Sequence, residues 1–180
     1  MLRGKSPDSQ SHKGIAMSTA HFISASILIG AGATLVMDLW LFGLKRLGVP
    51  TLNFAMVGRW AGHLCRGTLH HQAITKARPV AREVAWGWAI HYGVGIVFAG
   101  CLLMLAGEGW LTAPALWPAL GVGLGSVVAP LCILQPAMGA GFASAKTPTP
   151  LRNCLRSVVT HGVFGLGLYV SAVVFSLMQA

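Results

Sequence analysis

The chain has 180 residues, of which 54% are hydrophobic and 9% charged, and its mean hydropathy is +0.67. An ordinary soluble domain carries roughly 25% charged residues, so this composition excludes a soluble globular protein. The net charge of +9 does not indicate nucleic-acid binding. The lysines and arginines lie between apolar runs, where such residues orient a membrane protein and contact anionic lipid.

Four apolar runs each approach the ~20 residues needed to cross a hydrocarbon core of ~30 Å. They predict an all-α integral membrane protein with transmembrane helices at about residues 22–44, 84–106, 115–137 and 157–178. A polar tail, residues 1–19, precedes a single transmembrane domain at 20–180. Translation starting at Met17 would remove most of this tail.

The long connection at 45–83 begins with a helix stop at Gly48-Val49-Pro50. Residues Leu52, Met56, Trp60 and His63 then recur at steps of four and three, which is typical of an amphipathic helix. We predict a short interfacial helix at about 51–64 on the membrane surface, followed by a loop that covers the mouth of the bundle.

Charge predicts the orientation of the bundle. Most lysines and arginines lie in the connection at 45–82 and just before the fourth run. Because cytoplasmic connections are enriched in these residues, we expect both connections in the cytoplasm and both termini outside. The 45–82 connection would then contact the anionic lipids of the inner leaflet.

The last two runs contain signals of irregular and close packing. Pro130 and Gln135-Pro136 predict a kinked or unwound inner end for the third helix. Glycines four residues from His91 and His161 let helices approach closely in lipid. A glycine-rich chain of this size is also expected to form a homo-oligomer or to pair with a small membrane partner.

Topology places one polar side chain of each helix at a similar depth. At 1.5 Å per residue, Asp38 lies about 10 Å, His91 about 12 Å and His161 about 8 Å from the inner interface. Gln135 ends the third helix near this level, and Thr34 lies one turn before Asp38. Because each would be costly facing lipid, we expect them to point inward and to satisfy one another.

Such a polar layer fits a purely structural hydrogen-bonded network or one of three binding sites. Asp38 would titrate as the proton or ion site of a small transporter. Asp38, His91 and His161 also form a two-histidine, one-carboxylate metal set, with Gln135 as a further ligand. Alternatively, His91 and His161 are axial ligands of a b-type haem.

Transport or ion binding is the leading hypothesis for this layer. A metal- or haem-dependent redox component and a structural membrane partner stay as alternatives. No nucleophile elbow, zinc-protease motif or phosphate-binding loop occurs in the chain, which favours a role other than catalysis.

Several sequence blocks in order also resemble a family of small bacterial inner-membrane proteins of unknown function. They are GATLVMDLW, GRWAGHLCRG, GWAIHYGVGIVFA, VAPLCILQPAMGAGFASAKTPTP and THGVFGLGLY. The resemblance runs from about Ile29 to Tyr169. It implies a four-helix protein of the bacterial inner membrane, and it brings no activity, substrate or cofactor.

Overall fold

The computed structural model describes residues 18–179, and this part of the chain is helical with no strand. The all-α class is therefore confirmed. The Met17 start and nearly all of the predicted tail lie outside the described residues. Thr19, the last residue of the predicted tail, is the first residue of a helix, and Ser18 caps this helix because its side chain accepts one of the free backbone N–H groups of the first turn, that of His21.

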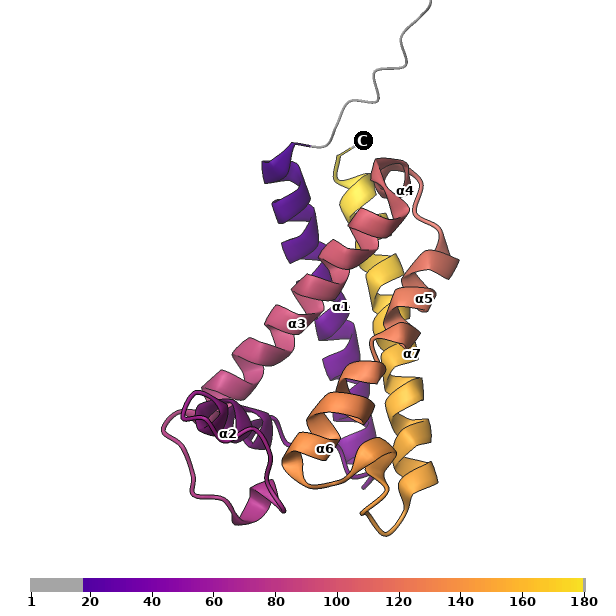
Figure 1. Ribbon diagram of the computed structural model, residues 1–180. Helices are drawn as coiled ribbons and strands as arrows, with labels where there is room; N and C mark the ends of the chain where they lie inside the picture. Colours follow the sequence, from indigo (N-terminus) through magenta and orange to yellow (C-terminus); the bar gives the residue numbers. More distant parts are fainter. Residues whose placement is uncertain (1–17, 180) are drawn as a thin grey trace, which may run out of the picture.

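Four helical segments are long and apolar enough to cross a membrane, as predicted. They are α1 Thr19–Arg46, α3 Glu83–Ala106, the composite segment Leu116–Met138 and α7 Pro150–Leu177. The segments alternate in direction, so α1 begins where α7 ends (Figure 1). We call this the terminal end of the bundle, and we call the opposite end, with the connections 47–82 and 139–149, the loop end (Figure 1).

The fourth helix begins at Pro150 and therefore extends further toward the loop end than the predicted membrane span, which begins at about 157. Proline suits the first turn of a helix because it has no N–H to leave unpaired and its φ is already helical. The first turns of α7 contain polar residues such as Arg152 and Asn153, so this part of the helix is not apolar and lies outside the apolar run. His161 therefore lies well inside α7 rather than near its start.

The third span is interrupted, in agreement with the predicted kink. It consists of α5 Leu116–Gly125, a π-helical segment η2 Ala129–Leu134 and a short helix α6 Gln135–Met138. Pro130 lies in the π-helical segment, where its missing N–H breaks the regular α-helical ladder. Gly139 ends α6 in the left-handed conformation, with φ 97°.

The four spans pack in the order α3, α1, α7, α5, and the contact between α3 and α5 is much smaller than the contacts between the other neighbours. Small residues permit the close contacts: Gly123 meets Gly165, and Gly167 meets Ala33. The core between the helices is apolar and centres on fully buried residues such as Leu168. A seam therefore stays open along one side of the bundle, between α3 and α5.

The predicted interfacial helix at 51–64 is α2, Phe54–Leu64, and Asn53 caps it by accepting the N–H of Ala55. Short helices also occur at η1 Ile74–Lys76, α4 Glu108–Thr112 and η3 Phe142–Ser144. The helix α2 lies across the start of α3 at the loop end (Figure 1). Contact with α3, and not the membrane surface alone, therefore sets the position of α2.

Backbone contact between α2 and α3 depends on two glycines. A Cβ at Gly58 would overlap the carbonyl of Glu83, and a Cβ at Gly87 would overlap the carbonyl of Phe54. We expect Gly87→Ala to destabilise the protein by about 1–3 kcal/mol, because the helices must separate to admit the methyl group. Thermal unfolding in detergent checks this value.

The matched control is Gly93→Ala on the same helix, where a Cβ would meet nothing within 4 Å. This control is expected to leave stability unchanged or to raise it slightly, because alanine favours the helix. Equal unfolding temperatures for Gly87→Ala and the wild type would contradict the predicted contact.

Candidate functional site

The centre of the site is a carboxylate shared between two donors of a neighbouring helix. Asp38 of α1 faces His91 and Tyr92 of α3. The distance from Asp38 Oδ1 to His91 Nε2 is 2.9 Å, and the Tyr92 hydroxyl donates to Asp38 Oδ2 over 2.9 Å. The side chains of Asp38 and His91 are 15% and 14% exposed. Both carboxylate oxygens are thus engaged within the bundle.

Aromatic side chains hold the His91 ring in place. Phe54, the first residue of α2, lies 4.2 Å from it between ring centroids, and Trp88 lies 5.9 Å away. The position of His91 therefore depends on α2 as well as on α1. Through Phe54, the polar contact inside the bundle is connected with the helix at the loop end.

Tyr92 is the functional candidate that sequence reasoning missed. The available signal was a tyrosine within an apolar run, since a buried tyrosine hydroxyl usually finds a hydrogen-bond partner. Its neighbour His91 was selected by depth, and Tyr92 lies at nearly the same depth.

A second polar contact joins α7 to the end of α5. His161 Nδ1 lies 2.7 Å from the Ser126 hydroxyl, which donates to the carbonyl of Gly123 over 2.6 Å. Because the hydroxyl has a single hydrogen, a serine that donates to Gly123 requires His161 Nδ1–H as the donor in the other contact. The Nε2 atom of His161 is then the unprotonated, basic nitrogen.

The five predicted layer residues do not form one network. Asp38 and His91 bond each other, but Gln135 accepts a hydrogen bond from Ser144 of η3 over 2.8 Å. Thr34 donates within its own helix, to the carbonyl of Gly30. The expected mutual network is thus replaced by separate contacts, with Gln135 turned to the connection at the loop end.

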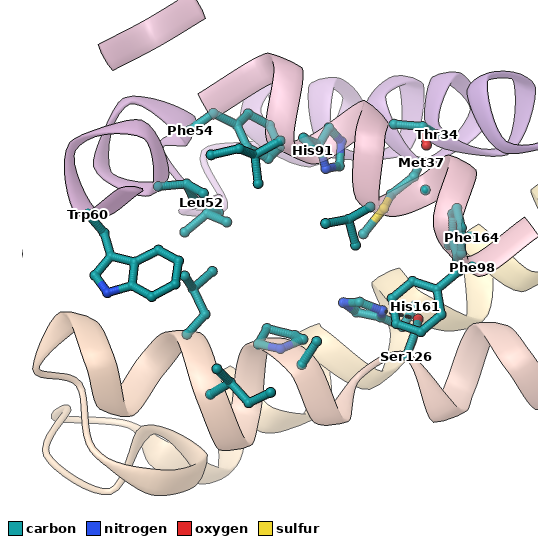
Figure 2. A pocket seen from close by; sticks show the side chains of 18 residues that line it. Thr34, Met37, Leu52, Phe54, Trp60, His91, Phe98, Ser126, His161 and Phe164 are labelled. Atoms are coloured by element: carbon teal, nitrogen blue, oxygen red, sulfur yellow. Dashed lines mark hydrogen bonds between the residues drawn. The ribbon is translucent and has the colours of Figure 1, made fainter. Parts of the chain in front are cut away.

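One cavity nevertheless connects most of these groups. It has a volume of about 290 Å³ and lies between α1, α2 and α3 on one side and α5, η2 and α7 on the other. His91 and His161 both line it, from different helices, as do Thr34 and Ser126 (Figure 2). The remaining wall is apolar, mostly aliphatic, and includes the aromatic residues Trp60, Phe54, Phe98 and Phe164 (Figure 2).

A family model described as "Protein of unknown function (DUF2938)" matches residues 27–175, which include every residue of the site. The chain belongs to the DUF2938 family. This membership confirms the resemblance noted in the sequence blocks. No curated protein and no solved structure matches the chain.

The side chains predicted to bind a metal are not grouped around a common point in this DUF2938 protein. Within residues 18–179, no group of three histidine, cysteine, aspartate or glutamate side chains is arranged to hold a metal ion. Asp38 and His91 contact each other, while His161 contacts Ser126. The metal set of Asp38, His91 and His161 and the haem pair stay predictions, which metal analysis and a visible spectrum check.

The structure also shows a buried ion pair at the loop end, which the sequence analysis did not anticipate. Arg59 of α2 is 8% exposed and forms two bonds to Glu83, of 2.9 Å and 2.8 Å. Its third nitrogen contacts backbone carbonyls of the loop, the shortest being Ala77 at 3.2 Å. The bond to Glu83 raises the pKa of Arg59, while burial opposes this shift. Arg59 therefore ties α2, η1 and the start of α3 together.

The rest of the loop in this DUF2938 protein contacts the end of the third span. The His71 N–H donates to the carbonyl of Ala137 over 2.8 Å, and the backbone at Gln72 packs on Gly139. The Trp60 indole donates to the carbonyl of Leu69. Burial, followed by the charges of the neighbouring histidines, lowers the pKa of His71. The loop thus joins the two sides of the bundle beside the cavity.

Proposed function

We propose that this DUF2938 protein is a small proton-linked transport protein, with Asp38, His91 and Tyr92 as its proton site. One observation carries the proposal. The Asp38 carboxylate lies within the bundle and contacts two titratable side chains, and one of these, His91, lines the cavity.

The chemistry of the site favours protons over metal ions. A carboxylate and an imidazole in contact hold one proton between them, and they gain or lose a second one as a coupled unit. In the described part of the chain, no lysine or arginine pairs with Asp38, so nothing cancels these changes in charge. An uncompensated change in charge within a membrane-spanning bundle favours movement of the surrounding helices.

The cavity supplies the link between the proton and a transported molecule. His91 contacts Asp38 with its Nε2 atom and also forms part of the cavity wall beside Phe54 of α2. A molecule in the cavity and a proton on the Asp38–His91 pair would therefore each alter the affinity for the other. We assign the loop end to the cytoplasm of a bacterial inner membrane, because its connections are rich in lysine and arginine.

Infrared spectroscopy tests the proton site directly. The wild-type protein in lipid nanodiscs is expected to show a protonated-carboxyl band whose intensity changes with pH and which is absent from Asp38→Asn. His91→Gln should shift the pH at which this band changes. An Asp38 band that does not change with pH would overturn the proposal.

Cysteine labelling tests whether the proton changes access to the cavity. Leu134 lines the cavity, so Leu134→Cys is labelled with a maleimide after Cys101, Cys132 and Cys154 are replaced by alanine. The exposed native Cys65 corrects for the intrinsic pH dependence of thiol reactivity. We expect the corrected rate to change by about threefold or more with pH and to become constant in Asp38→Asn. A pH-independent rate in the protein with intact Asp38 would contradict proton-linked transport.

A further inference from the structure

A second cavity extends the first one along the side of the bundle. Its volume is about 520 Å³, and it lies between α3 and α5 toward the terminal end. Phe98 and Ser126 line both cavities, which therefore adjoin there. On α3 the two linings run from Ile90 to Ala106, about 24 Å at 1.5 Å per residue. The open seam thus covers most of a hydrocarbon core of ~30 Å.

Two glycines of α5 keep this seam open. A Cβ at Gly121 or Gly125 would meet nothing within 4 Å, although both residues line the second cavity. Gly123 on the same helix behaves differently, because a Cβ there would overlap Gly165 of α7. Gly123 therefore serves helix packing, whereas Gly121 and Gly125 leave a bare backbone facing the space beside α3.

The size and position of the seam favour a hydrocarbon chain as its occupant. The first cavity, of about 290 Å³, is at the lower end of small-molecule pockets, and this part of the seam is too small for a second transmembrane helix. On α3 the first cavity runs from Ile90 to Phe98, about 12 Å. This length approaches the half-thickness of the bilayer, about 15 Å, which one leaflet's lipid chain occupies.

Charge at the loop end indicates the head group of this molecule. The first cavity reaches α2, where it is lined by Trp60 of this helix and by Leu52, which precedes the helix. The connection that contains α2, residues 47–82, has no aspartate or glutamate. It does expose several basic side chains: Arg66, Lys76, Arg78 and Arg82. Such a surface attracts an anionic head group.

We propose that the seam between α3 and α5 binds an acyl chain of an anionic phospholipid that enters sideways from the leaflet at the loop end. The head group then lies beside α2, and the chain passes His91 and His161 toward Phe98 and Ser126. This lipid is the class of molecule that the cavity handles, an assignment that rests on the proposed transport function.

Photo-crosslinking tests this proposal in nanodiscs. The probe is a phosphatidylglycerol with a diazirine in its acyl chain, and crosslinked peptides are identified by mass spectrometry. We expect crosslinks on α3 and α5 at partly buried seam residues such as Phe98 and Val122. Leu28 and Leu35 of α1, which are 56% and 52% exposed, provide the reference for ordinary lipid contact.

The decisive variant is Gly121→Leu/Gly125→Leu, which fills the seam without touching the histidines. Seam crosslinks are expected to fall by about fivefold or more relative to those on α1, because the added side chains exclude the acyl chain. Gly93→Leu, also in open space but lining neither cavity, should leave the ratio unchanged. An unchanged ratio in the double variant would overturn the proposal.

Further measurements distinguish an anionic lipid from a neutral lipid and from a second copy of the chain. A phosphatidylcholine probe that labels the seam as strongly as phosphatidylglycerol would overturn the assignment of an anionic head group. Seam crosslinks to a second copy of the chain, lost together with a dimer in native mass spectrometry, would show that a protein fills the seam. The Asp38 infrared band should persist in the seam-filled variant, so a failure of the lipid site is distinguishable from a failure of the proton site.

Discussion

Asp38→Ala is expected to lower the free energy of unfolding by about 3–5 kcal/mol, the largest effect among single substitutions in the bundle. The alanine leaves the donors of His91 and Tyr92 without their shared acceptor, in a part of the protein where little water replaces it. Chemical or thermal unfolding in detergent measures this change. The adjacent Leu39→Ala is the control, because Leu39 is 64% exposed on α1.

Asp38→Asn keeps the shape of the side chain and removes its negative charge. Asparagine has one carbonyl oxygen and therefore satisfies one of the two donors, so its loss of stability should be smaller than that of alanine. Combining Asp38→Ala with Tyr92→Phe should cost less than the sum of the single changes, because both remove the same hydrogen bond. Additive effects, or an alanine variant as stable as the wild type, would show that the contact is absent in the protein.

Arg59→Ala is expected to loosen the loop end while leaving the packing of α1 against α7 intact. It removes the partner of Glu83 and a donor to the loop carbonyls, so residues 65–82 lose their buried attachment to α2 and keep only the contacts of Trp60 and His63 with it. We expect roughly tenfold faster amide hydrogen exchange in this loop, with little change in the core of α7. Hydrogen-exchange mass spectrometry resolves the two regions.

Two other variants test whether loss of the Arg59–Glu83 pair causes the faster hydrogen exchange in the loop. Arg59→Met/Glu83→Gln should recover part of the protection, because neither charge is then left without its partner. The exposed Arg66→Ala changes the net charge of the loop equally and should not affect exchange. If Arg66→Ala accelerates exchange as much as Arg59→Ala, the effect is one of loop charge and not of the buried pair.

The parts of the helices that cross the hydrocarbon core were predictable from the sequence. A span of hydrocarbon demands about 20 apolar residues with internal hydrogen bonds, and this requirement is visible in sequence. The start of α7 was not predictable in this way, because its first residues are polar and a helix continues beyond the membrane without a hydrophobic signal. The break around Pro130 was predictable, because proline cannot donate a backbone hydrogen bond.

The depth of the site residues in the membrane was predictable from the sequence. The direction in which each side chain points around its helix axis was not. Counting residues placed Asp38 and His91 at a similar depth, and the structure joins them by a hydrogen bond. Gln135 was placed near the same level, yet it bonds Ser144. The involvement of Tyr92 and Ser126 depended on which side chains face a neighbouring helix, and a residue count contains no such information.

By itself, the sequence determined that this is an all-helical chain with four spans, a basic loop and polar side chains inside the apolar runs. These properties follow from local composition, because lipid selects for the length and polarity of each segment separately. Only the tertiary structure decided that α3 and α5 make a small contact beside two cavities, that Arg59 is buried against Glu83, and that two histidines share one cavity. Each of these features depends on how side chains far apart in the sequence meet, which the rotation and close approach of whole helices determine.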